Sequence, residues 1–330
     1  MRLAFFLLAA GVLYAQEQQF ASIGDLKLES GEVIRNCRVG YRTVGTLNAA
    51  KSNAVLFPTW FSGNSESLTA LIAKDKLVDP ERLFVIAVDA LGNGLSTAPS
   101  NSKEQPRLKF PKFTIGDMVE SQHRLLTQKF GITHLRGVMG ISMGGMQTFD
   151  WVVRYPEFMD VAIPIVGSPK MTAMDTLLWT AELRAIEEDA DWKNGNYTTE
   201  PALKAVGLIH AYALMTPRIR VEQTKNIPEF IKTSEEGRKF DANDWYRQLQ
   251  AMLAQDLGSK YGSLDAAAAR VKAKMLIIVA SQDHMVNPTT ALSFASAAGA
   301  RTIVLEGDCG HQAPGCEQQE IAPAIAQFLR

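Results

Sequence analysis

The sequence Gly-Ile-Ser-Met-Gly at residues 140–144 is the feature of this chain with the clearest chemical meaning. It lies between an apolar run at residues 135–139, which indicates a strand, and a helix-like stretch at residues 145–151. In this setting a G-x-S-x-G turn raises its serine hydroxyl above the edge of a sheet, whereas elsewhere the same letters form a simple turn of small residues. Glycines permit the sharp turn because a Cβ in their place would clash with neighbouring backbone. Ser142 is therefore a candidate nucleophile, and it needs a base.

The acid and the base that such a serine needs follow it along the chain, in the order that accompanies this turn. Asp283 follows a continuous apolar run at residues 274–280, where an aspartate either orients the base or caps the next helix. His311 follows the last expected strand, at residues 302–305, in a loop that contains glycine. Side chains after parallel strands meet at the carboxyl edge of a sheet. We predict that His311 takes the serine proton and that Asp283 fixes the imidazole tautomer.

Four other histidines are weaker candidates for the base. His123 and His134 precede the serine, against the expected chain order. His210 falls on an expected helix, where we predict a core or surface role. His284 adjoins the acid, so the two side chains point apart. His311 is therefore the expected base.

The tetrahedral intermediate of acyl transfer needs two backbone N–H donors for its oxyanion. One is expected from Met143, the residue after the nucleophile, and the other from the loop after the strand at residues 54–57. In that loop we favour the Phe61 amide over the amide of Trp60, and Trp60 is also a candidate for substrate binding. Loss of one such donor typically costs about 3–4 kcal/mol of transition-state stabilisation.

Length and charge restrict the classes of function. A chain of 330 residues holds either one large α/β domain with an insertion or two smaller domains. The net charge is −1 and there is no basic stripe, so nucleic acid is not an expected partner. We expect no metal and no bound cofactor, and the sequence does not decide between a monomer and a homodimer.

The first fifteen residues have the pattern of a secretory signal peptide. A positive start is followed by an almost wholly apolar stretch at residues 3–13 and by a polar stretch at residues 16–19. We predict cleavage after Ala15 and a secreted or periplasmic protein, the alternatives being an uncleaved anchor or a misassigned start. The apolar stretch is too short to span a bilayer, and we expect no membrane segment after cleavage.

The chain has three cysteines, and in the oxidising compartment of an exported protein paired cysteines are expected to form disulfides. Cys309 and Cys316 bracket His311, and we predict a disulfide between them that holds this loop in shape. By the chain-entropy model, closing so short a loop stabilises the fold by about 2–3 kcal/mol. The alternatives are two free thiols or a metal pair with His311, although a metal site needs more ligands than this segment offers. Cys37 is expected to be buried as a small hydrophobic residue.

Strands and helices alternate along most of the chain, which predicts a mostly parallel sheet. The expected strands are mainly continuous apolar runs, as strands covered on both faces require. They are expected at residues 54–57, 83–88, 135–140, 161–166, 275–280 and 302–305. Residues 20–48 alternate in polarity, which indicates an antiparallel N-terminal hairpin at one edge of the sheet.

The interval at residues 170–260 breaks this alternation because it contains helices and loops but no expected sheet strand. We predict that it forms a cap over Ser142, which excludes water and shapes the substrate pocket. The alternative is a separate helical domain with no part in the site. The core then comprises residues 16–169 and 261–330. Three tryptophans of the cap are expected to pack rather than to contact a ligand: Trp179, Trp192 and Trp245.

The triad order resembles that of the α/β-hydrolase superfamily, and further motifs are similar to the homoserine O-acetyltransferase family. These motifs are Phe-Thr-Ile-Gly-Asp-Met-Val at 113–119, Gly-Ile-Ser-Met-Gly-Gly-Met-Gln at 140–147 followed by Trp151, Asp-Ala-Leu-Gly-Asn-Gly-Leu-Ser-Thr at 89–97, and Asp-Trp-Lys-Asn-Gly-Asn-Tyr at 191–197. The resemblance runs from about residue 24 to the C-terminus and implies an α/β-hydrolase fold with a helical cap. That family binds its substrate's carboxylate with an arginine on a cap helix. The matching position here falls near Tyr212, which becomes a candidate for substrate binding.

The resemblance and the export signal point to different acyl acceptors. The transferase reaction consumes acetyl-CoA, a cytoplasmic cofactor that an exported enzyme lacks, so water becomes the acceptor. We therefore expect an exported serine hydrolase that cleaves a small-molecule ester through an acyl-Ser142 intermediate. A homoserine O-acetyltransferase or related acyltransferase using acetyl-CoA is the alternative. A non-catalytic binding protein on the same scaffold is a third hypothesis, and the complete triad argues against it.

Overall fold

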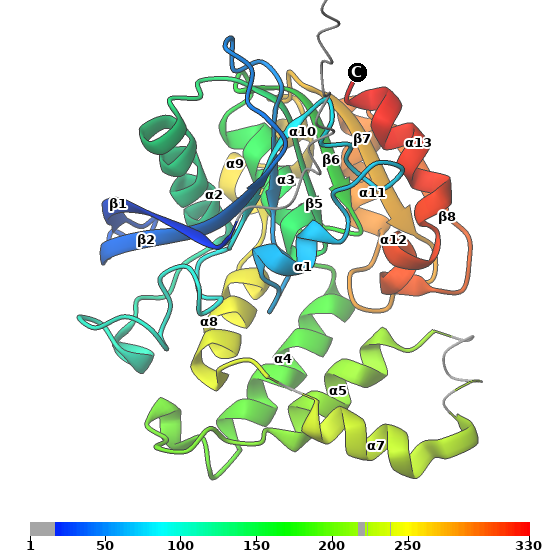
Figure 1. Cartoon of the computed structure of the whole chain (residues 1–330). Coiled ribbons are helices and arrows are strands. Elements are labelled where there is room, and N and C mark those ends of the chain that lie inside the picture. The colour runs from blue at the N-terminus through cyan, green and yellow to red at the C-terminus, as the bar shows by residue number, and fades with distance from the viewer. Residues whose placement is uncertain (1–16, 217–221, 223, 238) are drawn as a thin grey trace, which may run out of the picture.

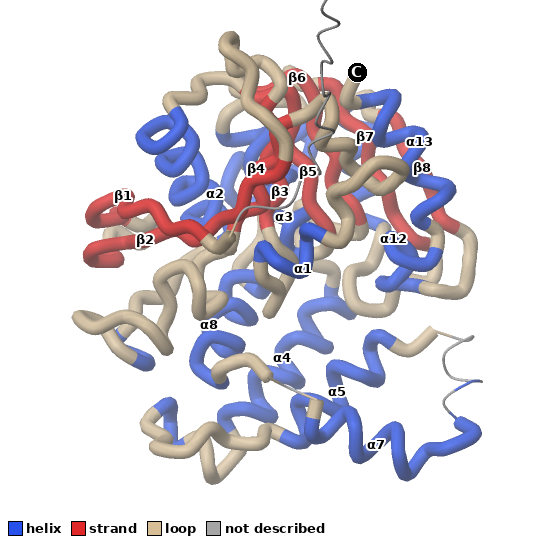
Figure 2. Tube along the Cα trace, in the orientation of Figure 1, coloured by secondary structure: helices blue, strands red, loops and turns tan. Residues whose placement is uncertain are grey.

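A single mixed sheet forms the centre of the protein (Figures 1 and 2). The computed structural model describes residues 17–216, 222, 224–237 and 239–330, so the signal peptide predicted at residues 1–15 lies outside the described residues. Within these ranges the sheet has eight strands in the spatial order β1-β2-β4-β3-β5-β6-β7-β8. Their bounds are Gln19–Lys27 for β1, Val33–Val44 for β2, Ala54–Pro58 for β3, Phe84–Val88 for β4, Leu135–Ile141 for β5, Met159–Ile165 for β6, Lys274–Ala280 for β7 and Arg301–Leu305 for β8.

Strand direction changes twice across the sheet, because only β2 runs opposite to the other strands. β1 pairs with β2, and β2 with β4, in antiparallel register. The remaining pairs, from β4 across to β8, are parallel. Every residue of β3 and β4 is buried, which explains why these strands are continuous apolar runs. The predicted parallel sheet with an antiparallel N-terminal hairpin is confirmed.

Helices cover both faces of this sheet. α2, α3, α9, α10 and α11 belong to one packed layer, and α1 and α13 belong to the other. Successive strand residues alternate between the layers, as Leu276 and Ile277 of β7 do. Cys37 of β2 is buried, and burial raises the pKa of its thiol to about 12, so it remains protonated. The helix bounds are Ser65–Thr69 for α1, Ile115–Arg124 for α2, Met143–Arg154 for α3, Leu257–Tyr261 for α9, Leu264–Ala268 for α10, Thr289–Ala298 for α11, Ala313–Cys316 for α12 and Gln318–Phe328 for α13.

Between β6 and β7 the chain leaves the sheet and forms a helical insertion, which lies below the sheet in Figure 1. Its helices include α4 (Ala173–Glu187), α5 (Lys204–Leu214), α7 (Ile227–Glu236) and α8 (Ala242–Leu253). α4 begins at a capping box of Thr172 and Asp175, and Asp175 also accepts a hydrogen bond from the Asn287 N–H at 3.0 Å. None of the helices in the described ranges is long and apolar enough to cross a bilayer.

Helix α8 fixes the insertion to the core through buried polar contacts. Asp244 accepts hydrogen bonds from the N–H and the hydroxyl of Ser100, at 2.9 and 2.5 Å. Arg247 donates to the carbonyls of Leu108 and Phe110. Burial raises the pKa of Asp244 well above its usual range and lowers the pKa of Arg247. Because each group is costly to bury without these partners, α8 is held in one position on the core.

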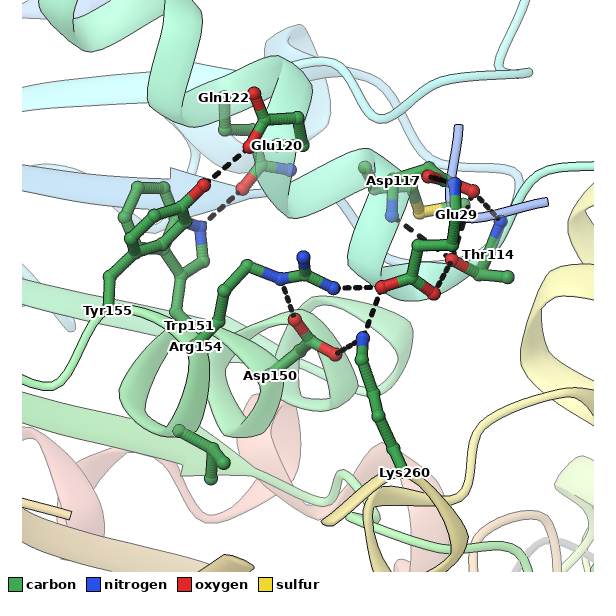
Figure 3. Close-up of polar contacts among 12 residues, drawn as sticks. Glu29, Thr114, Asp117, Glu120, Gln122, Asp150, Trp151, Arg154, Tyr155 and Lys260 are labelled. Carbon is green, nitrogen blue, oxygen red and sulfur yellow. Dashed lines mark hydrogen bonds and ion pairs between the residues drawn. The ribbon is translucent and has the colours of Figure 1, made fainter. Parts of the chain in front are cut away.

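A network of charged side chains joins the turn after β1 to helices α2, α3 and α9 (Figure 3). Glu29 pairs with Arg154 of α3 and Lys260 of α9, and Asp150 of α3 pairs with the same two cations. The Glu29 N–H also donates to Asp117 of α2 at 2.8 Å. Burial by itself raises the pKa of Glu29, but the hydrogen bonds and charges of Lys260 and Arg154 outweigh it and lower the pKa. The network therefore favours the ionised carboxylate.

Candidate active site

Ser142 occupies a sharp turn between β5 and α3. Its φ and ψ are 57° and −121°, a strained conformation for a residue with a Cβ. Its N–H donates to the Ile165 carbonyl of β6 at 2.9 Å, which holds the turn against the sheet. A Cβ on Gly140 would lie 2.2 Å from the Gly144 carbonyl oxygen, and a Cβ on Gly144 would lie 2.6 Å from the Pro58 oxygen. The two glycines are therefore required for the turn that presents Ser142 to a cavity at the carboxyl edge of the sheet.

The structure brings His311 and Asp283 to Ser142. His311 Nε2 lies 2.8 Å from Ser142 Oγ, and His311 Nδ1 lies 2.7 Å from Asp283 Oδ2. The other carboxylate oxygen of Asp283 accepts hydrogen bonds from the N–H groups of Met285 and Val286, both at 2.9 Å. Because an ionised carboxylate only accepts hydrogen bonds, Nδ1 carries the proton and Nε2 presents its lone pair to the serine hydroxyl.

A disulfide closes the loop that carries His311. It joins Cys309 and Cys316, whose Cα atoms are 6.4 Å apart, and the enclosed segment forms a 3₁₀ turn followed by α12. Gly310 has a φ of 53°, and a Cβ there would lie 2.7 Å from the Gln282 carbonyl oxygen. The loop of the histidine thus packs directly against the segment that carries the acid.

Two backbone N–H groups are candidates for oxyanion donors. Met143 is the first residue of α3, and Phe61 lies in the loop after β3. Neither N–H donates a hydrogen bond within the part of the chain that the structure describes, so both are available to a ligand. The loop after β3 is restrained at the next residue, since Ser62, with a φ of 57°, donates its N–H to Gln248 Oε1 of α8 at 3.0 Å.

Gln147 of α3 joins the two segments that carry these N–H groups, a role that was not predicted from the sequence. Its amide nitrogen donates to the carbonyls of Thr59 and Met143, both at 3.1 Å. Gln122 of α2 donates to Gln147 Oε1, which fixes the orientation of the Gln147 amide. Trp151 in turn donates to Gln122 Oε1 at 2.7 Å (Figure 3). The only signal in the sequence is that Gln147 lies one helical turn after Met143.

A cavity of about 410 Å³ adjoins the serine. Its walls come from the loop after β3, from the helical insertion and from the loop of the histidine. It is lined by Trp60, Phe61, Ser62, Leu71, Ile141, Ser142, Trp179, His210, Leu214, Met285, His311, Gln312, Pro314 and Gly315. A mostly apolar lining with a few polar groups is typical of a site for a small organic molecule. Among the described residues, no group of three His, Cys, Asp or Glu side chains is arranged to hold a metal ion.

The insertion contributes different residues to this cavity from those predicted. Tyr212, predicted to bind substrate, is 63% exposed and does not line the cavity. His210 and Leu214 line it instead, because residues four apart share one face of α5 and a residue between them points elsewhere. Trp179, predicted only to pack, also lines the cavity, whereas Trp60 lines it as expected.

The chain is similar to known proteins over most of its length. Residues 53–314 match the family model described as alpha/beta hydrolase fold. A probable esterase of Corynebacterium glutamicum is 35% identical over 335 residues, covering 94% of each chain. A homoserine O-acetyltransferase of Acidiphilium cryptum is 30% identical over 363 residues, again covering 94% of each chain. Among solved structures, an acetylester hydrolase from Corynebacterium glutamicum superposes with a TM-score of 0.85 and 31% identity, covering 94% of both chains. The chain therefore belongs to the α/β-hydrolase family, and it is an enzyme of the group that contains both ester hydrolases and acyltransferases.

Proposed function

We propose that the protein is an exported serine esterase that hydrolyses acetyl and other short acyl esters through an acyl-Ser142 intermediate. One observation carries this proposal: Ser142, His311 and Asp283 form a continuous hydrogen-bonded series beside a small, mostly apolar cavity. Two similar proteins, a probable esterase and an acetylester hydrolase, support this class of substrate.

In the acylation step, His311 Nε2 takes the proton of Ser142 Oγ as this oxygen bonds to the ester carbonyl carbon. The carbonyl electron pair moves onto its oxygen, where the N–H groups of Met143 and Phe61 stabilise the negative charge. When the carbonyl re-forms, the bond to the alcohol oxygen breaks and the alcohol takes the proton from His311. Asp283 stabilises the imidazolium throughout without taking its proton.

In the deacylation step, water replaces the alcohol. His311 takes a proton from the water as the water oxygen bonds to the acyl carbon. The N–H groups of Met143 and Phe61 then stabilise the second oxyanion. Collapse of this intermediate breaks the bond to Ser142 Oγ, which regains its proton from His311. The products are a carboxylic acid and the free enzyme.

An acyltransferase is the second candidate function, because a homoserine O-acetyltransferase is 30% identical over nearly the whole chain. The same acyl-serine would then pass its acyl group to a substrate hydroxyl instead of water. Two observations favour hydrolysis. The signal-like sequence at residues 1–15 and the disulfide at Cys309 and Cys316 are both typical of exported proteins, which have no supply of acetyl-CoA.

Hydrolysis of p-nitrophenyl acetate tests the proposal. We expect a burst of p-nitrophenol with the wild type and a fall in kcat of about 10⁴-fold or more for Ser142→Ala. Ser293→Ala, at an exposed serine on α11, is the matched control and should keep wild-type activity. Activity that survives Ser142→Ala would refute the proposed nucleophile. Formation of O-acetylhomoserine from acetyl-CoA and homoserine faster than ester hydrolysis would favour the transferase.

Export is tested separately by locating the mature protein. Cells that express the full chain should yield a periplasmic or secreted protein whose N-terminus is Gln16. A cytoplasmic protein that keeps residues 1–15 would overturn the proposed export and would restore access to acetyl-CoA.

A further inference from the structure

A fully buried carboxylate lies behind the wall of the cavity that faces the insertion. Glu182 of α4 has no exposed surface and lies 3.1 Å from His210 Nδ1 of α5. Trp245 Nε1 of α8 donates to its other oxygen at 3.3 Å. Helices α5 and α8 thus each place a polar group against a carboxylate of α4. Burying a charge is costly, and packing alone would favour an apolar residue at this position.

The imidazole of His210 connects this carboxylate to the cavity. Since Nδ1 faces the carboxylate, the free nitrogen is Nε2, which has no hydrogen-bond partner within the described ranges. The ring is held by aromatic neighbours, with centroid distances of 6.0 Å to Phe61, 6.0 Å to Trp179 and 5.1 Å to Trp245. The side chain is nevertheless 21% exposed and lines the same cavity as Ser142. A fixed, accessible ring nitrogen without a protein partner at the wall of a cavity is suited to bind a polar group of a ligand.

A second hollow also lies against His210. Ser62, His210 and Leu214 line both the cavity of the serine and a second hollow of about 670 Å³, whose lining also includes Arg42 and Asn64. A substrate that extends beyond its reacting ester toward this second hollow therefore passes the imidazole.

We propose that His210 and Glu182 form a subsite for a hydroxyl group in the alcohol portion of the ester. The subsite rests on the esterase function proposed above. An acetyl group has only two carbons, so the part of an acetyl ester that reaches the insertion is its alcohol portion. A hydroxyl group suits Nε2 in either protonation state, because it donates to the neutral ring and accepts from the protonated ring. The preferred substrates are then monoacetates of diols and related polyhydroxy compounds rather than simple alkyl acetates.

Matched pairs of acetates test this subsite. Each hydroxyalkyl acetate is compared with the alkyl acetate of equal heavy-atom number, for example 2-hydroxyethyl with n-propyl acetate and 4-hydroxybutyl with n-pentyl acetate. At the best-fitting length, we expect kcat/KM to be about tenfold higher for the hydroxylated ester, as one hydrogen bond permits. His210→Phe, which keeps an aromatic ring, should bring this ratio to about one. His134→Phe, at an exposed histidine paired with Asp160, should leave the ratio unchanged.

A second variant and a measurement on the wild type keep the test decisive if His210→Phe fails to fold. Glu182→Gln replaces the carboxylate that faces Nδ1 of the imidazole and should also lower the ratio. Inhibition of the wild type by 1,4-butanediol should be stronger than inhibition by 1-pentanol, which has the same number of heavy atoms. A wild-type ratio near one, equal inhibition by the two alcohols, or a ratio that His210→Phe leaves unchanged would overturn the subsite. Absence of p-nitrophenyl acetate hydrolysis would instead refute the esterase function itself.

Discussion

Replacing Gln147 by leucine tests whether the link between α3 and the loop after β3 positions the oxyanion donors. The change removes the hydrogen bonds that Gln147 donates to Thr59 and Met143 and the one that it accepts from Gln122. Leucine has nearly the volume of glutamine, so little cavity is created. The Thr59 carbonyl and the Gln122 amide each lose a buried partner at about 1–3 kcal/mol, so the free energy of unfolding should fall by about 2–6 kcal/mol.

The effect on catalysis should be separate from this loss of stability. Without the link, the Phe61 N–H is no longer held in place relative to the Met143 N–H, and loss of one oxyanion donor costs about 2.7–4 kcal/mol. We therefore expect kcat to fall by about 10²–10³-fold. KM should change by less than about threefold, because the planar carbonyl of the bound ester depends on the donors less than the tetrahedral intermediate does.

Three measurements separate the two effects. Steady-state kinetics with p-nitrophenyl acetate give kcat and KM, and urea unfolding gives the stability of each variant. Affinity for a short-chain trifluoromethyl ketone, which forms an oxyanion adduct with the serine, should fall by a factor similar to that of kcat. Gln319→Leu, at an exposed glutamine of α13, is the control. A Gln147→Leu enzyme that is destabilised but keeps its kcat within about threefold and its affinity for the ketone would refute a positioning role.

Three further predictions concern the acid, the disulfide and the charged network. Asp283→Asn should lower kcat by about 10⁴-fold because its amide N–H favours the wrong imidazole tautomer, and a loss of less than about tenfold in steady-state assays would contradict this. Cys316→Ser should lower the free energy of unfolding by about 2.5 kcal/mol in urea titrations, and dithiothreitol should then destabilise the wild type but not the variant. Folding lowers the pKa of Glu29 below its ordinary value of 4.5, so its contribution to stability is present above that pH and is lost as pH falls through the folded pKa. The difference in melting temperature between wild type and Glu29→Gln should therefore be larger at pH 7 than at pH 3, and an equal difference would contradict the role of Lys260 and Arg154.

The core of the fold could be predicted because its burial leaves a local signal. β3 and β4 are buried on both faces, so their sequences are unbroken apolar runs that are distinguishable without knowledge of their neighbours. Ser142 could be located for a similar reason, since the strained turn admits only small residues at Gly140 and Gly144. The chain order of acid and histidine then selected Asp283 and His311 from the other candidates.

The pocket could not be predicted in the same way, because it depends on how the helices of the insertion cross. α5 is apolar along most of its length, so its sequence does not show which face meets the cavity. The resemblance placed Tyr212 at the position of the family's carboxylate-binding arginine, whereas the structure has His210 lining the cavity. The role of Gln147 escaped prediction because its partner Thr59 lies 88 positions away in the sequence. A hydrogen bond from a side chain to a distant backbone carbonyl leaves no periodic pattern in either segment.

Helix α8 links the insertion to the chemistry of the site, whereas α4 and α5 shape the pocket. Gln248 of α8 accepts a hydrogen bond from the Ser62 N–H and donates to the Leu91 carbonyl, both at 3.0 Å, so it restrains the loop that carries the candidate oxyanion donor. α4 and α5 instead place Trp179 and His210 in the cavity wall. The Phe61 ring also packs against Trp179 and His210, at centroid distances of 5.9 and 6.0 Å, so changes in α4 and α5 that keep these contacts can alter the pocket while α8 holds the oxyanion loop. A probable esterase and a homoserine O-acetyltransferase are 35% and 30% identical to this chain, so overall identity does not separate the two candidate functions, and the residues that α4 and α5 place in the cavity wall are where we expect the acceptor to be selected.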